Sequence, residues 1–262
     1  MHAVMSDGTR IAYVFHGDPN SSNRVVLLHS LAMDHTFWRP VAQALSSEAA
    51  VLTVDCRGHG ASDKPAGPYT VEQFADDLAQ LMTHIGWDSA VVAGASMGGC
   101  ISLAFAIRHP ARTKGLGLFD TTACYGDKAL PAWEERANKA MTEGLEGLIA
   151  FQTTRWFSDG FRERSPDVVQ ACVDVFLRNE LPAYAATCVM LGTADLRPLL
   201  HTIKAPARII VGDEDYATPI PMAQTMHAGI AGSTLRIVPG ARHLSPLEIP
   251  DDVVAELRVL LG

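Results

Sequence analysis

A serine set between glycines is the residue of this chain best suited to covalent chemistry. It lies in Gly94-Ala95-Ser96-Met97-Gly98, after the apolar run Val91-Val92-Ala93 and before the helix-like segment 100–107. A strand that turns sharply into a helix strains the serine backbone and needs glycine on both sides, because a Cβ there would collide with the neighbouring strand or helix. This nucleophile elbow predicts that Ser96 is a nucleophile; a tight turn with a solvated serine is the alternative.

A serine hydroxyl is a weak nucleophile at neutral pH, so a base must accept its proton and a third group must orient that base. His243 lies in the loop 239–245, after the last expected strand. Where the serine lies on a nucleophile elbow, the order along the sequence is serine, acid, histidine. We therefore expect His243 to be the base. His227 is also nearby but falls on an expected helix, and the other interpretation of His243 is a surface histidine on a turn.

The acid is expected in the loop Gly212–Pro219, which follows the penultimate expected strand and carries several carboxylates. Asp215 fits best because it lies deep enough in this loop to turn back under the histidine, whereas Asp213 is too near the strand end. Asp120 follows the strand after the elbow, another place from which a carboxylate can reach the histidine. It remains the alternative acid.

A serine nucleophile that attacks a carbonyl group also needs two backbone N–H donors for the oxyanion that forms. One comes from the residue after the nucleophile, which is Met97, and the other from the loop after an early strand, where Leu31 stands. These two residues are predicted to form an oxyanion hole. His29, just before that loop, is expected to hold the loop through hydrogen bonds.

The elements that must position these residues alternate along the chain. Short continuous apolar runs are typical of strands buried on both faces of a parallel sheet, and Thr70 is a good N-cap for an amphipathic helix. We expect strands at 10–15, 25–28, 50–54, 91–95, 115–120, 207–211 and 234–238, and helices at 38–45, after Thr70, at 100–107 and at 251–260.

This alternation predicts an α/β fold with a mostly parallel central sheet, helices on both faces, and ligands beyond the carboxyl ends of the strands. From 123 to 196 the sequence changes to helix-like segments without buried-strand runs. We interpret residues 123–196 as an inserted helical cap, and residues 1–122 and 197–262 as the core.

The charge of the chain limits its partners. A formal net charge of −8 at pH 7 argues against a surface for nucleic acid or for an anionic membrane. An anionic substrate must therefore meet a local basic group. The N-terminal residues lack the basic and apolar regions of a signal peptide, and no stretch approaches the length of a membrane span. We expect a cytoplasmic protein that acts on a small molecule.

The cysteines and histidines give no sign of a metal or a disulfide framework. The five cysteines are scattered without a Cys-x-x-Cys pair, and the ten histidines show no metal-ligand spacing. Buried thiols and catalysis without a cofactor are expected.

With these motifs the whole chain resembles an α/β-hydrolase fold enzyme, and within that fold it is similar to the 3-oxoadipate enol-lactonases. The narrower marks are Arg155-Trp156-Phe157, Ala194-Asp195-Leu196-Arg197 and His243-Leu244-Ser245. Segments that many hydrolases share are 30–34 with Trp38, 55–62 and 67–72. The chain departs from the lactonases at three positions, where it has Ala32 for glycine, Ala95 for leucine and Pro246 for asparagine.

The resemblance implies a butenolide substrate that carries a carboxymethyl group. It implies that Ser96 attacks the ring carbonyl, that the ring oxygen leaves as an enol, and that His243 activates water to release the acid. The substrate carboxylate would then meet Arg155, and Trp156 would wall the pocket. The alternatives are an intramolecular salt bridge for Arg155 and cap packing for Trp156.

Other functions fit parts of the pattern. A carboxylesterase or a cofactor-free perhydrolase would use the same three residues with a more open, apolar pocket. A carbon–carbon bond hydrolase would have a loop richer in glycine and proline around Leu31, and a dehalogenase or epoxide hydrolase would need aspartate at position 96. A binding protein without activity would not need Ser96, Asp215 and His243 together.

Overall fold

An eight-stranded sheet forms the centre of the protein in the computed structural model, which describes residues 1–262. The strands lie in the order β1-β2-β4-β3-β5-β6-β7-β8. Strands β1 and β2 are antiparallel to their neighbours, and all pairs from β4 to β8 are parallel. The strands are β1 (His2–Val4), β2 (Arg10–His16), β3 (Arg24–Leu28), β4 (Ala50–Val54), β5 (Ala90–Ala95), β6 (Thr113–Phe119), β7 (Ala207–Gly212) and β8 (Thr234–Val238).

The middle strands are buried along almost their whole length, as their continuous apolar sequences predict. In β3, Val26 pairs with Leu52 of β4 on one side and with Val92 of β5 on the other. All three side chains are fully buried. The predicted mostly parallel sheet is therefore confirmed, and the carboxyl ends of β3 and β5 meet at one edge.

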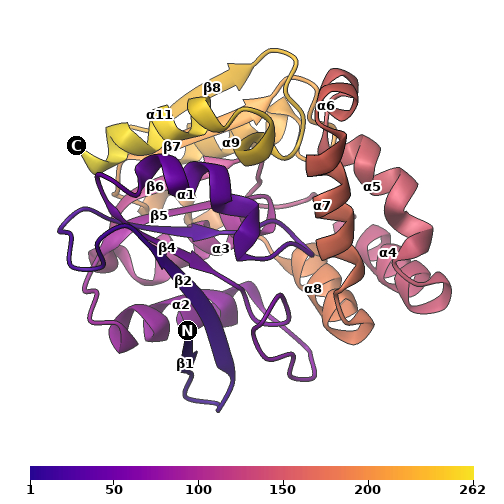
Figure 1. The fold of residues 1–262 in the computed structure, drawn as a ribbon, viewed down its shortest axis with the longest axis horizontal. Coiled ribbons are helices and arrows are strands. Elements are labelled where there is room, and N and C mark those ends of the chain that lie inside the picture. The colour runs from indigo at the N-terminus through magenta and orange to yellow at the C-terminus, as the bar shows by residue number, and fades with distance from the viewer.

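Helices cover both faces of the sheet (Figure 1). Helices α1 and α11 pack together on one face, and α2 and α3 pack together on the other. The side chain of Thr70 caps α2 by accepting a hydrogen bond from the Gln73 N–H. The helices of the core are α1 (Arg39–Leu45), α2 (Val71–His84), α3 (Met97–Arg108), α9 (Ile220–Gly229), α10 (Ser245–Glu248) and α11 (Pro250–Leu261).

Five further helices lie between β6 and β7 and form a separate group beside the sheet (Figure 1). They are α4 (Ala129–Glu143), α5 (Ile149–Trp156), α6 (Asp159–Arg164), α7 (Pro166–Leu177) and α8 (Leu181–Thr193). The segments by which the chain enters and leaves this helical group lie side by side. The Leu196 N–H donates to the Ala123 carbonyl at 2.9 Å, and Cys124 and Asp195 form an isolated antiparallel β-bridge. This pairing supports the division at 123 and 196, which we keep as a proposal.

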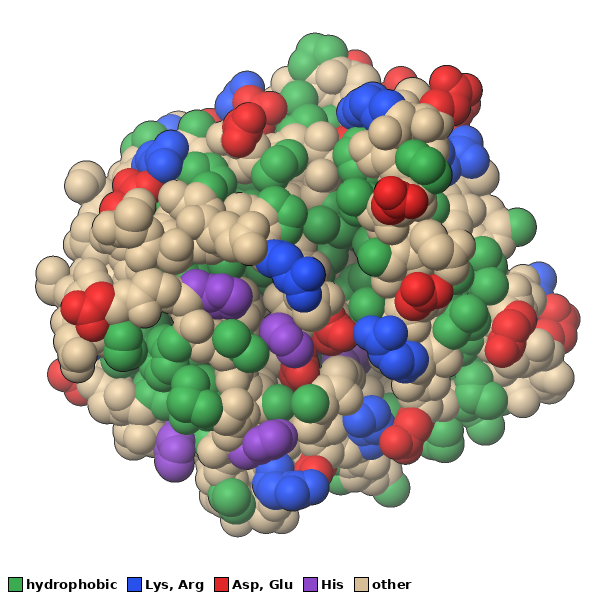
Figure 2. Space-filling model, viewed as in Figure 1, with side chains coloured by type: hydrophobic (Ala, Val, Ile, Leu, Met, Phe, Trp, Pro, Cys, Tyr) green, Lys and Arg blue, Asp and Glu red, His purple; other side chains and the backbone are tan.

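Acidic and basic side chains are interspersed over the face shown in Figure 2, without an extended region of one sign. The excess of acidic residues is therefore not concentrated there. No helix has the length and apolar character needed to span a membrane.

Candidate active site

Ser96 lies at the turn between β5 and α3 with a backbone φ of +51°. Two glycines make this turn possible. A Cβ on Gly94 would lie 2.1 Å from the Gly98 backbone, and a Cβ on Gly98 would lie 2.1 Å from the carbonyl oxygen of Leu28. Because backbone atoms cannot move aside as a flexible side chain can, only glycine fits at either position. The Ser96 N–H donates to the Phe119 carbonyl at 2.9 Å, which fixes the turn against β6.

Ser96, His243 and Asp215 form a continuous hydrogen-bonded chain, although they come from three distant loops. The Nδ1 of His243 lies 2.9 Å from Asp215 Oδ2, and its Nε2 lies 2.9 Å from Ser96 Oγ. A carboxylate can only accept, so Nδ1 donates to Asp215, and Nε2 is left to accept from the serine hydroxyl. All three side chains are buried. The geometry gives the serine a base and the base an orienting acid.

The Asp215 carboxylate is held by hydrogen bonds of its own loop as well as by the histidine. The Ala217 and Thr218 N–H groups donate to Oδ1 at 2.7 and 3.0 Å, and the Thr218 hydroxyl donates to Oδ2 at 2.7 Å. Burial alone would raise the pKa of Asp215, but attraction to His243 and these hydrogen bonds outweigh it and lower the pKa to about 2. Asp215 is therefore ionised throughout the neutral range.

The other two aspartates considered for the acid make different contacts. Asp120 is fully buried and accepts hydrogen bonds from the Ser245 N–H at 2.8 Å and the Gly212 N–H at 3.3 Å. Burial, together with repulsion by Asp215, raises its pKa well above the usual range. Asp213 is exposed and accepts from the Gly240 N–H at 2.7 Å. Neither carboxylate is hydrogen-bonded to His243.

The helical group holds the histidine loop in place. Both the His243 and the Leu244 N–H donate to the carbonyl of Trp156, each at 3.1 Å. Arg242 donates from Nη1 to the carbonyls of Thr154 and Phe157 at 2.8 and 3.0 Å. The end of α5 therefore orients the loop that carries His243.

The two residues predicted to form the oxyanion hole lie beside the serine. Met97 is the first residue of α3, where a helix leaves its N–H groups without an intrahelical partner. Leu31 lines the same cavity as Ser96, and its N–H makes no backbone hydrogen bond. His29 holds the Leu31 loop as expected: Nδ1 contacts the Ser30 carbonyl at 2.8 Å, and Nε2 accepts from the Cys56 N–H at 3.0 Å.

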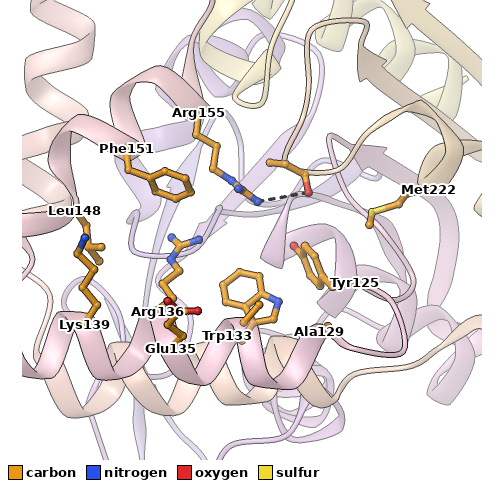
Figure 3. Close-up of a pocket in the computed structure, with 12 residues that line it drawn as sticks. Tyr125, Ala129, Trp133, Glu135, Arg136, Lys139, Leu148, Phe151, Arg155 and Met222 are labelled. Carbon is orange, nitrogen blue, oxygen red and sulfur yellow. Dashed lines mark hydrogen bonds between the residues drawn. The ribbon is translucent and has the colours of Figure 1, made fainter.

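Two neighbouring cavities lie on the side of the serine that faces the helical group. The inner one, about 20 Å³, is lined by Ser96, His243, Leu31 and residues of the helical group, including Arg155 and Trp156. The outer one, about 530 Å³, lies between α4, α5 and the loop after β7 (Figure 3). Four residues line both cavities and therefore stand at the boundary between them, which we call the neck: Tyr125, Trp133, Arg136 and Arg155.

The alternative interpretation of Arg155 was an intramolecular salt bridge, but Arg155 forms none. Its Nη2 donates to the Ala217 carbonyl at 3.5 Å (Figure 3), and its guanidinium stacks on Phe151. Trp156 lines the inner cavity and also packs edge-on against Phe176. Trp156 therefore has a packing role in addition to its place in the cavity wall.

Sequence reasoning missed several residues of the neck and the inner cavity. Gln152 is buried there, and its Oε1 has no hydrogen-bond partner. Its spacing from Arg155 and Trp156 on α5 could have revealed it, because residues three and four apart share one face of a helix. Arg136 lies in a polar stretch of α4 that carries no such signal.

The arrangement of acidic, cysteine and histidine side chains offers no candidate metal centre. No group of three or more such side chains is placed to hold a metal ion.

A mostly parallel sheet with a strained serine after β5 defines a hydrolase of the α/β-hydrolase fold, and the chain belongs to that family. The model of the alpha/beta hydrolase fold family matches residues 23–164. The chain is 32% identical to 3-oxoadipate enol-lactonase 2 of Acinetobacter baylyi over 226 residues, which cover 86% of this chain and 84% of the relative.

Solved structures agree with this assignment. The enol-lactonase from Burkholderia xenovorans LB400 is 36% identical, with a TM-score of 0.94 over 100% of this chain and 99% of its own. A thermophilic esterase from Thermogutta terrifontis, solved with malate bound, is 28% identical, with a TM-score of 0.92 over 100% of this chain and 98% of its own.

Proposed function

We propose that this hydrolase opens a small enol-lactone that carries a carboxylate, through an acyl-enzyme on Ser96. Ser96 is the nucleophile, His243 the general base and Asp215 the acid that orients it. The N–H groups of Leu31 and Met97 bind the oxyanion. The observation that carries the proposal is the hydrogen-bonded chain from Asp215 through His243 to Ser96, buried beside a cavity that Arg155 also lines.

The reaction proceeds in two halves. His243 Nε2 takes the Ser96 proton as the oxygen adds to the lactone carbonyl, and the resulting oxyanion accepts two N–H hydrogen bonds. When the ring C–O bond breaks, the ring oxygen leaves as an enol that takes the proton from His243 and tautomerises to a ketone. His243 then activates a water molecule, which releases the carboxylic acid and restores the serine.

The carboxylated substrate is supported by two independent considerations. Arg155 lies in the cavity wall without a carboxylate partner, although the protein has an excess of acidic residues. Relatives that share most of this chain are named enol-lactonases, and one esterase of the same fold was solved with the dicarboxylate malate. Arg155 is assigned to the substrate carboxylate, and Trp156 to the cavity wall.

The decisive assay follows the loss of 3-oxoadipate enol-lactone absorbance and compares kcat/KM with that for p-nitrophenyl acetate. The proposal expects the lactone to be the better substrate, and expects Arg155→Gln to lower kcat/KM for the lactone about tenfold or more, since a hydrogen bond to a charged group is lost. Lactone turnover that is absent, or unaffected by Arg155→Gln, would refute the substrate assignment.

A carboxylesterase or perhydrolase acting on another small ester is the second candidate. The observation that favours it is the outer cavity of about 530 Å³, of whose 12 lining residues 8 are hydrophobic. This candidate expects p-nitrophenyl esters to be hydrolysed far faster than the lactone. The same comparison of the two substrates therefore separates the two functions.

A further inference from the structure

Two arginines stand at the neck between the cavities, and neither has a carboxylate partner. Arg136 donates from Nε to the Tyr184 hydroxyl at 2.7 Å and stacks over Trp133, while Arg155 contacts a backbone carbonyl and stacks on Phe151. By contrast, ten other arginines of the chain form salt bridges: Arg10, Arg57, Arg108, Arg162, Arg178, Arg197, Arg208, Arg236, Arg242 and Arg258.

The two guanidinium groups approach one another from opposite sides of the outer cavity. Arg136 comes from α4 and Arg155 from α5, and Figure 3 shows both pointing into the space between these helices. Burial lowers the pKa of Arg155, and the positive charge of Arg136 lowers it further. Burial also acts to lower the pKa of Arg136, but attraction to Tyr184 and Cys188 outweighs it and raises that pKa, so Arg136 stays charged. Glu135, the one acidic residue that lines the outer cavity, forms no salt bridge with either. Two like charges held together in a partly apolar space are unfavourable until an anion lies between them.

The neck also faces an unpartnered polar atom on its inner side. The Gln152 side chain is buried in the inner cavity beside Ser96, and its Oε1 accepts no hydrogen bond. A buried amide oxygen without a partner costs free energy that a ligand or water molecule with an O–H or N–H donor can recover. This independent observation indicates that the inner cavity accommodates a polar molecule, whose donor, and not its carboxylate, would face Gln152 Oε1.

We propose that Arg136 and Arg155 together form an anion clamp that selects carboxylated substrates and determines how far the carboxylate lies from the carbonyl that Ser96 attacks. This inference rests on the proposed function for the identity of the reaction, but the clamp itself does not depend on the lactone. A carboxylate held at the neck places the rest of the molecule toward the inner cavity and Ser96. The substrate class is therefore small acids whose ester or lactone carbonyl lies a few atoms from a free carboxylate.

The clamp can be tested without the natural substrate. The protein is assayed with the neutral ester p-nitrophenyl acetate, and adipate and succinate are added as inhibitors, with adipamide as the uncharged counterpart. We expect the dicarboxylates to inhibit competitively and adipamide to inhibit weakly. Arg136→Gln and Arg155→Gln should each raise the inhibition constant of the better dicarboxylate about 10-fold to 100-fold, because each removes hydrogen bonds to a charged group. Arg136→Lys, which keeps the charge, should raise it less.

Arg164→Gln is the matched control. Arg164 also lies in the helical group, at the end of α6. It stacks over Phe161 and forms no salt bridge, but it lines neither cavity. This variant should be inhibited as strongly as the parent protein is. If only Arg155→Gln weakens inhibition, Arg136 is not part of a clamp. If the dicarboxylates inhibit no better than adipamide, there is no clamp at all. Either result would overturn the clamp without changing the outcome of the lactone assay. If only the lactone assay fails, the proposed function is wrong and the clamp is still supported.

Discussion

At the scale of single residues, the account depends on which carboxylate orients His243. Asp215 is a buried residue of the loop after β7, and it accepts hydrogen bonds from the Thr218 hydroxyl of the same loop and from Nδ1 of His243, which lies after β8. Asp120 instead accepts from the backbone N–H of Gly212, at the end of β7, and from that of Ser245, at the start of α10. We therefore propose Asp215 as the orienting acid, whereas Asp120 links β7 to α10.

Replacing Asp215 by asparagine should therefore remove most of the activity without removing the serine. The new side-chain amide can present its N–H to Nδ1 of His243, which would leave the proton on Nε2 and deprive Ser96 of its base. We expect kcat to fall about 10³-fold to 10⁴-fold at neutral pH. The control is Asp213→Asn two positions earlier, on an exposed carboxylate that contacts only the Gly240 N–H. The kcat of both variants is measured with any ester that the protein hydrolyses. An equal fall in kcat in the two variants would contradict the role of Asp215 as the acid that orients His243.

The sequence predicts most of this site because its chemistry imposes a pattern on neighbouring residues. Ser96 needs Gly94 and Gly98, since a Cβ at either position meets backbone atoms, and such a requirement is visible in the sequence. Arg136 and Gln152 are different. They come together with the serine only through the packing of α4 and α5 over the sheet, and no local rule records that packing.

At the scale of elements, the loop after β3 contains an unusual backbone conformation. Ala32 has a φ of +60° and is fully buried, in the loop that carries Leu31. Residues with a Cβ are strained in this left-handed region, and glycine is not. The Ala32 carbonyl also accepts from the Asn179 side chain at 2.9 Å, so the strained residue is tied to the helical group.

Ala32→Gly should accordingly stabilise the protein. We expect the free energy of unfolding to rise by about 0.5–1 kcal/mol, because relief of strain outweighs the extra freedom of glycine in the unfolded chain. Ala255→Gly, in the exposed middle of α11, should lower it by about 1 kcal/mol. Urea unfolding of the two variants should therefore give shifts of opposite sign, and a loss of stability with Ala32→Gly would show that the loop is not strained.

The positions of most strands and core helices along the chain follow from the sequence for the same kind of reason, although the three-residue strand β1 is not among those predicted. Each of β3, β4 and β5 is a short apolar run between turn residues, and such runs are typical of buried parallel strands. The arrangement of α4 to α8 does not follow in this way. Their sequences indicate helices but not which of their faces turn toward Ser96, because several of them have apolar residues on more than one side.

At the scale of the whole molecule, buried carboxylates make folding sensitive to acid. Burial alone would raise the pKa of Asp55, but hydrogen bonds from His35 and Ala61 outweigh it and lower the pKa from 3.8 to about 2. The pKa of Asp215 is lowered to about 2 as well. Above about pH 5 both groups are ionised in the folded and unfolded chains, and their stabilisation is complete. Between about pH 5 and pH 2 the unfolded chain binds their protons first, and the stabilisation is lost.

Each of these groups should contribute about 2 kcal/mol of stability at neutral pH, most of which is lost as the pH falls from about 5 to about 2. Asp55→Asn should lower the free energy of unfolding at pH 7 and also flatten its dependence on pH below 4. Asp18→Asn, at an exposed loop residue that contacts only nearby Asn20, should change neither. Urea unfolding at a series of pH values measures the free energy of unfolding of each variant. If that free energy falls below pH 4 as steeply in Asp55→Asn as in the parent protein, Asp55 does not contribute to the acid sensitivity.

The central claim, that Ser96 is the nucleophile activated by His243, has one direct measurement. The protein is treated with a fluorophosphonate, which forms a stable phosphonyl ester with an activated serine and releases fluoride, and the modified peptide is located by mass spectrometry. The account predicts one adduct, on Ser96, formed in step with loss of activity and greatly slowed by His243→Ala. An adduct on another residue, or full activity after Ser96 has been modified, would contradict it.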